Sequence, residues 1–172
     1  MKTIVAVDKN WGIGKNNDLL FHLKEDMSFF KKMTLGKVIV MGSNTLMSLP
    51  GCKPLKNRIN IVLFPGGEKR QDCIVVDSLD ELIEELKKYD SDDIFIVGGA
   101  MFYKTMLPYC DTAYITKVDA DGGATHFFEN LDQKEEWELV EESDEILDNG
   151  YKIRFTTYKN NWVKQYKQTE DS

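Results

Sequence analysis

The stretch Ile94-Phe95-Ile96-Val97-Gly98-Gly99 joins a continuous apolar run to two adjacent glycines, and residues 100–107 follow with helical character and stop at Pro108. A short apolar run rich in β-branched residues is typical of a strand that is buried on both faces. The glycines at its end permit a tight turn into the next element. The stretch therefore predicts a strand–turn–helix unit, which is the repeating unit of proteins that pack helices on a parallel sheet.

The same order of elements recurs along the chain. Ser78 has Glu81 three residues after it, which is the spacing of a capping box, and an amphipathic stripe over residues 79–86 predicts the helix that they begin. Further apolar runs of strand length lie at residues 3–7, 37–41, 59–63 and 74–76.

The last third of the chain changes character. Residues 112–118, 137–143 and 151–158 are strand-like without a strong helical pattern between them, and Asn149-Gly150 is a hairpin signal. We predict an α/β fold in a single domain, with a mostly parallel central sheet, crossover helices on both faces and an antiparallel C-terminal hairpin. The domain is expected to span residues 1–160, followed by a polar tail at 161–172.

Composition narrows the function classes. The net charge is −7 and the pI is about 4.9, so nothing favours binding to nucleic acid. No apolar stretch approaches the ~18 residues that a membrane span needs. Cys52, Cys73 and Cys110 are odd in number and lack metal-ligand spacing, and His22 and His126 are the only histidines, so we expect no metal site. We expect a cytoplasmic monomer with reduced thiols.

Asp26 is an acid on the apolar side of a predicted helix over residues 23–33. At about 100° per residue, Leu23, Met27, Phe29, Phe30 and Met33 fall on one arc, and Asp26 lies within it. A buried carboxylate needs a partner or keeps its proton, which is typical of a functional acid. The alternative is a residue in the first turn that favours the helix dipole.

The loop before this helix, residues 8–22, carries two glycines and several Asn and Asp residues, so we expect a long, irregular and mobile connection. Its apolar residues are too numerous for a solvated linker. Such a loop either covers an apolar ligand or seals the core.

Gly42-Ser43-Asn44-Thr45 forms a second junction of the Gly98-Gly99 kind between an apolar run and a helical segment. Two such junctions at the carboxyl ends of strands would hold one dinucleotide, as open α/β sheets generally do. Either junction alone could equally be a tight turn. Neither is a GxGxxG fingerprint, and Gly14-Lys15 lacks the upstream glycine of a phosphate-binding P-loop.

These motifs together resemble the dihydrofolate reductase family. Val5-Ala6-Val7-Asp8, Gly12-Ile13-Gly14-Lys15, Leu19-Leu20-Phe21-His22-Leu23, Asp26 and Phe30 are similar, in order and spacing, to that family's first strand, mobile loop and pterin-binding helix. The resemblance covers about the first 160 residues. It implies hydride transfer from NADPH to dihydrofolate, with Asp26 as the catalytic acid, and antifolate-type small molecules as further ligands.

The resemblance also implies binding residues. Arg58 would pair with the α-carboxylate of folate, the hydroxyl of Thr116 would bond Asp26, and apolar side chains would enclose the aminobenzoyl group. The implied substrate-binding residues are Val5, Ala6, Met27, Phe30, Leu49, Leu55, Arg58 and Thr116. The implied cofactor-binding residues are Ala6, Ile13, Gly14, Leu19, Gly42, Ser43, Asn44, Thr45, Leu63, Phe64, Val97, Gly98, Gly99, Ala100, Met101 and Phe102.

The chain departs from the family pattern at several positions. Leu20-Phe21 replaces the usual Pro-Trp of the loop, so the tryptophan N–H that helps to hold water near the pterin is absent. Ser43, Phe64-Pro65 and Met101 stand where basic or hydroxyl groups commonly contact the 2′-phosphate of NADPH. These departures put the cofactor preference in question, with Lys69 and Arg70 as possible substitutes.

Two other functions stay open at this stage. A pyrimidine reductase of riboflavin synthesis resembles the family in fold but should lack the counterparts of Phe30 and Arg58. A degenerate, non-catalytic nucleotide-binding protein would explain the lost phosphate contacts and Phe21.

Overall fold

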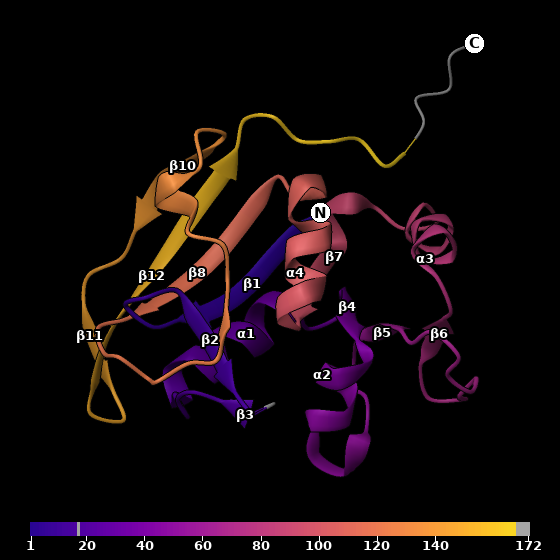
Figure 1. Ribbon diagram of the computed structural model, residues 1–172, viewed down its shortest axis with the longest axis horizontal. Helices are drawn as coiled ribbons and strands as arrows, with labels where there is room; N and C mark the ends of the chain where they lie inside the picture. Colours follow the sequence, from indigo (N-terminus) through magenta and orange to yellow (C-terminus); the bar gives the residue numbers. More distant parts are fainter. Residues whose placement is uncertain (17, 168–172) are drawn as a thin grey trace.

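The computed structural model describes residues 1–16 and 18–167, and in this part of the chain nine strands form one twisted sheet (Figure 1). Its strands are β1 (Lys2–Val7), β4 (Val38–Gly42), β5 (Ile59–Leu63), β6 (Ile74–Val76), β7 (Ile94–Gly98), β8 (Thr112–Val118), β10 (Trp137–Glu142), β11 (Ile146–Asp148) and β12 (Tyr151–Asn160).

The order across the sheet is β10-β12-β8-β1-β7-β4-β5-β6, with β11 paired to β12. The strands from β8 to β6 are parallel to their neighbours, whereas β12 runs antiparallel to β8, β10 and β11. The predicted fold class, a mostly parallel sheet with an antiparallel C-terminal end, is confirmed.

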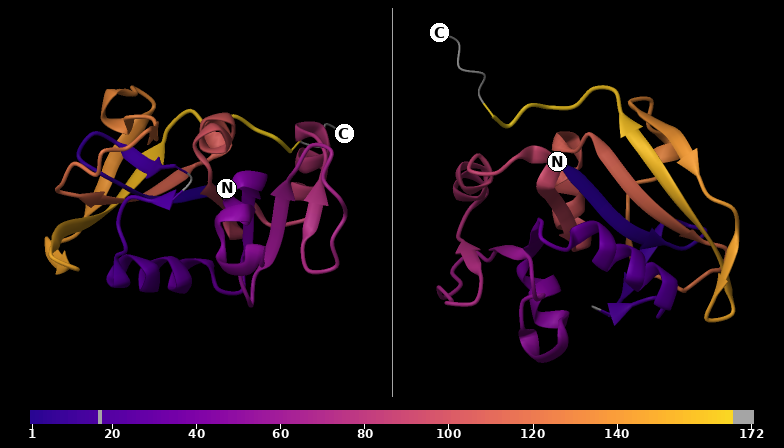
Figure 2. Two further views of the ribbon diagram at one scale, coloured as in Figure 1. Left: turned by 60° about the horizontal axis from the view of Figure 1, so that its bottom comes forward. Right: turned by 180° about the vertical axis from the view of Figure 1, so that it is seen from behind.

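Helices cover both faces of the sheet (Figure 2). They are α1 (Lys24–Thr34), α2 (Ser43–Ser48), α3 (Leu79–Leu86) and α4 (Ala100–Met106), with 3-10 turns at Pro50–Cys52, Ser91–Asp93, Leu107–Tyr109 and Leu131–Gln133.

Side chains that alternate along the strands separate two core layers. Val38 and Val40 of β4 belong to the cluster that contains α3 and α4, whereas Ile39 and Met41 belong to the cluster with α1 and α2. All four side chains are buried. A continuous apolar strand is therefore needed wherever both faces are covered.

The loop before α1 is more ordered than we predicted. Within it, β2 (Gly12–Lys15) and β3 (Asp18–Leu19) form a small antiparallel sheet with β9 (His126–Phe127). The buried Asp8 accepts backbone hydrogen bonds from Asn10 at 2.8 Å, Gly12 at 2.7 Å and Gly122 at 3.0 Å, so one carboxylate ties this loop to the loop after β8. The expectation of an irregular connection was wrong because a distant segment supplies the third strand.

Trp11 is also buried, and its ring stacks on Phe128 at 6.4 Å. It anchors the loop to the core.

The chain after β12 crosses toward α3 (Figure 1). The backbone N–H of Lys164 donates to Pro108 at 2.8 Å, the ammonium of Lys167 donates to the carbonyl of Tyr89 at 2.8 Å, and Tyr166 packs on the core. The division of the chain at residue 160 stays a prediction, and residues 168–172 of the predicted tail lie outside the described residues.

No helix within residues 1–16 and 18–167 is long and apolar enough to cross a membrane. The same residues contain no group of three or more His, Cys, Asp and Glu side chains arranged to hold a metal ion.

Candidate active site

Asp26 lies in the first turn of α1, on the side of the helix that faces the sheet. The hydroxyl of Thr116, a buried residue of β8, donates a hydrogen bond of 2.6 Å to Oδ1 of Asp26. Asp26 therefore has the partner that a buried carboxylate needs, and it also lies in the first turn of α1, where an acid favours the helix dipole. The contact implied by the resemblance between these two residues is present.

The surroundings of Asp26 favour its protonated form. Burial raises the pKa of Asp26, the hydrogen bond from Thr116 lowers it, and the nearby charge of Asp148 raises it again, with a net increase. A carboxyl group with a raised pKa can hold or relay a proton closer to neutral pH than an ordinary aspartate can.

Tyr103 of α4 is a second polar group beside this site, and we did not expect it from the sequence. It is buried, and its hydroxyl donates to the carbonyl of Ile4 in β1 at 2.9 Å. Burial, and then the charge of Asp26, raise the pKa of Tyr103, so the phenol stays neutral and keeps the proton that it donates to Ile4. An aromatic residue among the apolar positions of a helix gives no sequence signal beyond a core position.

Arg58 presents a guanidinium without an acidic partner among the described residues. Its Nε is buried and has no hydrogen-bond partner there, and burial lowers the pKa of Arg58. Its guanidinium carbon lies 5.9 Å from the ring centre of Phe30. The side chain of Asn60 bonds the backbone of Leu55 and the carbonyl of Arg58, and so fixes the turn that holds the arginine. Such a planar, unpaired cation suits a carboxylate.

The apolar residues expected around a substrate divide into two groups. Phe30, Leu49 and Leu55 are partly buried and pack in the same cluster on the α1 face of the sheet. Met27 is 62% exposed, so its placement on a buried arc was wrong.

On β1, Val5 and Ala6 are partly buried, and Ala6 is the register partner of Thr116. Ala6 therefore borders the Asp26 pair, whereas the side chain of Val5 packs against the cluster with α3 and α4.

The two strand-to-helix junctions lie side by side, as a shared ligand would require. A Cβ atom added to Gly98 would lie 2.7 Å from Oγ1 of Thr45, so the turn from β7 into α4 closely approaches the start of α2. Among the described residues, no side chain caps either helix at its N-cap residue, Gly42 or Gly99. The free N–H groups of two adjacent helix ends fit the pyrophosphate of a dinucleotide.

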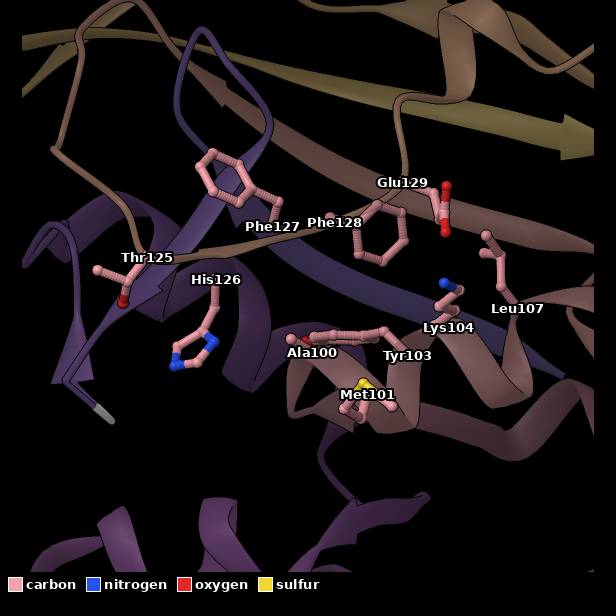
Figure 3. Close-up of a pocket in the computed structure, with 10 residues that line it drawn as sticks. All are labelled: Ala100, Met101, Tyr103, Lys104, Leu107, Thr125, His126, Phe127, Phe128 and Glu129. Carbon is pink, nitrogen blue, oxygen red and sulfur yellow. The ribbon is translucent and has the colours of Figure 1, made fainter.

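A cavity of about 280 Å³ lies between α4 and the segment that contains β9 (Figure 3). Ala100 and Met101 line it at the start of α4, and Met101 is 77% exposed. Thr125 and His126 line it from the opposite side, and Ala100 places the cavity next to the Gly98-Gly99 junction.

Comparison with known proteins decides the family. The sequence model of the family described as "Dihydrofolate reductase" matches residues 1–160. The chain belongs to the dihydrofolate reductase family. It is 36% identical over 159 residues to the dihydrofolate reductase of Bacillus subtilis, covering 91% of this chain and 92% of that protein. It is 34% identical over 154 residues to the enzyme of Haemophilus influenzae, covering 88% of this chain and 93% of that protein.

A solved structure supports the same family. Dihydrofolate reductase from Enterococcus faecalis, complexed with NADP(H) and RAB-propyl, superposes with a TM-score of 0.80 at 31% identity, covering 93% of this chain and 95% of that chain. The recognition of the family from the sequence is confirmed.

The remaining residues that the dihydrofolate reductase pattern assigns to the cofactor vary in exposure. Phe102 is buried in the core, whereas Leu19 is 62% exposed at the end of β3. Partly buried are Ile13, Ser43, Leu63, Phe64 and Val97, whereas Asn44 is exposed and Gly14 is buried.

Lys69 and Arg70, which we considered as contacts for the 2′-phosphate of NADPH, already have acidic partners. Lys69 lies 3.4 Å from Glu81, and Arg70 makes two hydrogen bonds to Asp72, at 2.8 and 2.7 Å. Both cations are therefore already paired with carboxylates and are not free to bind the 2′-phosphate.

Proposed function

We propose that this member of the dihydrofolate reductase family reduces 7,8-dihydrofolate to 5,6,7,8-tetrahydrofolate with NADPH, and so supplies one-carbon carriers for nucleotide and amino-acid synthesis. The observation that supports this activity most directly is the partly buried Asp26, bonded to Thr116, with a raised pKa. The family and its named relatives support the same reaction.

Asp26 binds the amino-amide edge of the pterin through two hydrogen bonds. Through water, it promotes protonation of the ring nitrogen next to the carbon that accepts the hydride. The hydrogen bond from Thr116 to Oδ1 fixes the orientation of the Asp26 carboxyl group for these two bonds. NADPH supplies the hydride when it is bound. The protein contributes binding, orientation and electrostatics.

Arg58 binds the α-carboxylate of the folate tail. Its buried Nε lacks a partner among the described residues, and a charge-assisted bond to a carboxylate would satisfy it. Phe30, Met27, Leu49 and Leu55 enclose the aminobenzoyl group. Met27 is exposed and therefore accessible to a ligand.

The two junctions at Gly42 and Gly98-Gly99 hold the pyrophosphate of NADPH, with Ser43, Asn44 and Thr45 at the start of α2 and Ala100, Met101 and Phe102 at the start of α4. Their adjacency and their uncapped helix ends support this assignment. Ala6, Ile13, Gly14, Leu19, Leu63, Phe64 and Val97 complete the proposed cofactor site.

The test is the fall in NADPH absorbance with and without dihydrofolate. Consumption of NADPH that depends on dihydrofolate supports the reductase. Consumption with a ribosylated aminopyrimidine alone would favour the pyrimidine reductase, and nucleotide binding without turnover would favour the non-catalytic protein.

We also propose that the enzyme is a cytoplasmic monomer that binds neither nucleic acid nor membranes. Three free cysteines and a net charge of −7 support this assignment. Gel filtration with light scattering tests the oligomeric state.

The preference for NADPH over NADH should be smaller than is usual in the family. Phe64 donates its backbone N–H to Val76 at 2.8 Å, which places the turn after β5 beside Asp77, an acid whose Oδ1 accepts from Gly66. The carboxylate of Asp77 at this turn would repel the 2′-phosphate that distinguishes NADPH from NADH. We still expect NADPH to be the better substrate, because Ser43 and Asn44 can donate from a helix start, and added salt should reduce the preference.

The measurement is the ratio of kcat/KM for the two cofactors at low and moderate salt. A preference of more than about a thousandfold, roughly 4 kcal/mol, would contradict the expectation. Ser43→Arg should improve the use of NADPH and leave that of NADH nearly unchanged.

Gly14→Val should slow hydride transfer by about tenfold or more, with a smaller effect on folate binding. Gly14 lies in β2, accepts a hydrogen bond from the N–H of Thr125 at 2.9 Å, and has the carbonyl of Asp18 only 3.3 Å from where a Cβ would stand. A branched side chain must displace β3, and small misplacements in a closing loop slow the chemical step.

Single-turnover kinetics and folate titration separate the two effects, and Gly14→Ala is the milder control. Amide exchange in residues 9–23 that does not change with bound cofactor and folate would contradict a loop that closes during turnover.

A further inference from the structure

α1 begins without a capping side chain of its own. Its N-cap residue is Leu23, whose side chain cannot accept a hydrogen bond. The carboxylate of Asp148, more than 120 residues later in the chain, takes this part instead. It accepts from the backbone N–H of Lys24 at 3.0 Å, of Glu25 at 2.8 Å and of Asp26 at 3.3 Å.

Asp148 is itself held in place. It is the last residue of β11, it is only 5% exposed, and it pairs with Tyr151 across the Asn149-Gly150 turn. Beside it, the side chain of Asn149 donates to the carbonyl of His22 at 3.0 Å. The tip of this hairpin therefore makes hydrogen bonds to the chain before the start of α1 and to the first turn of the helix.

The same hairpin leads to the partner of Asp26. β12 follows the turn and runs antiparallel to β8, with Phe155 opposite Thr116. Asp148 thus joins the helix that carries Asp26 to the pair of strands that carries Thr116. A shift of α1 against the sheet would lengthen the bond of 2.6 Å between Asp26 and Thr116 unless the hairpin moved with it.

The charge of Asp148 has two effects. A carboxylate at a helix N-terminus stabilises the helix through its exposed N–H groups and dipole. Burial raises the pKa of Asp26, and the nearby negative charge of Asp148 raises it further because two like charges repel each other. The other group that acts on Asp26 is the hydroxyl of Thr116 from β8, whereas Tyr103 from α4 is a neutral phenol on which the charge of Asp26 acts.

We propose that Asp148 is a positioning residue for the reduction: its carboxylate fixes the first turn of α1 and keeps Asp26 against Thr116. The inference rests on the proposed function, in which Asp26 carries the chemistry. It adds a residue from a distant hairpin that never touches the substrate.

The first test follows the titration of Asp26 itself and does not depend on activity. Carbon NMR of the carboxyl groups, with the Asp26 signal assigned by its loss in Asp26→Asn, gives the midpoint in the wild type and in Asp148→Asn. The asparagine keeps the shape and one acceptor oxygen but removes the charge. The midpoint should fall by about 0.5 to 1 pH unit, the size of shift that a neighbouring charge commonly causes.

Glu25→Gln is the matched control. Glu25 lies in the same helix turn, its side chain is exposed, and the change removes the same charge without removing an acceptor from the helix start. It should leave the Asp26 midpoint nearly unchanged. An unchanged midpoint in folded Asp148→Asn, or an equal shift in Glu25→Gln, would overturn the proposal.

The second test measures turnover. The pH profile of hydride transfer should move in the same direction in Asp148→Asn, whereas a merely structural defect would lower the rate equally at every pH. Asp148→Ala should lower kcat by roughly ten- to a hundredfold with less change in KM, because it removes the contacts that place Asp26. A wild-type protein that does not reduce dihydrofolate would refute the proposed function, while the NMR midpoints would still decide whether Asp148 acts on Asp26.

Discussion

Asp26→Asn is expected to preserve the fold and to reduce the turnover of dihydrofolate by about a hundredfold or more at pH 7. Asparagine can keep a hydrogen bond with Thr116, but it has no ionisable proton and cannot promote protonation of the pterin. The geometry of the site is retained, so the loss reports on proton supply. The measurement is the rate of NADPH oxidation at saturating substrate.

The pH dependence of this loss distinguishes the catalytic role from a structural one. As the pH falls, solvent protonates the substrate directly, so the gap between the wild type and Asp26→Asn should narrow. Glu25→Gln, an acid-to-amide change one residue earlier, should retain wild-type turnover. A turnover of Asp26→Asn near the wild-type value at pH 7 would rule out the assignment.

The same carboxyl group affects stability. Because the folded protein raises the pKa of Asp26, it binds more protons than the unfolded chain between the ordinary value of about 3.9 and the raised one. Stability attributable to Asp26 therefore falls as the pH rises through this window and stays lower at neutral pH. Asp26→Asn should equal or exceed the wild type in its urea midpoint at pH 7, which shows that lost activity is not lost folding.

Local patterns predicted the fold because they coincide with how the elements pack. The run at β7 is apolar at successive positions since Phe95 faces the cluster with α1 and α2, while Ile94 and Ile96 face the cluster with α3 and α4. The cap at Ser78 is also local: its hydroxyl accepts from the N–H of Glu81 at 3.1 Å. Interactions within a few residues can be read from the sequence.

Contacts between residues that are distant in the sequence could not be predicted from local sequence patterns. Asp148 precedes an Asn-Gly turn, where an acid is common, so nothing in the sequence indicates that it caps a helix that begins at Lys24. Helical periodicity likewise placed Met27 with buried residues, because it gives the side of the helix but not whether another element covers that side. The hydrogen bond between Asp26 and Thr116 was predicted from the family resemblance alone, and only the structure gives its length and direction.

Arg58→Ala should raise the KM for dihydrofolate by about ten- to a hundredfold, because charge-assisted hydrogen bonds contribute roughly 1.5–3 kcal/mol and each ~1.4 kcal/mol is a factor of ten. Removing the guanidinium leaves the folate carboxylate without a partner at the edge of a partly apolar site beside Phe30. The loss should appear in KM more than in kcat, since the tail is remote from the reacting ring.

The comparison of ligands with and without the glutamate tail decides whether Arg58 binds the substrate. A pterin without the glutamate tail should bind Arg58→Ala and the wild type almost equally, and Lys56→Ala, which removes an exposed cation two residues away, should change neither ligand. Arg58→Lys should recover only part of the loss, because an ammonium cannot form the paired bonds of a planar guanidinium. Equal losses for the two ligands would show instead that Arg58 supports the turn held by Asn60, and that its buried Nε serves the fold rather than the substrate.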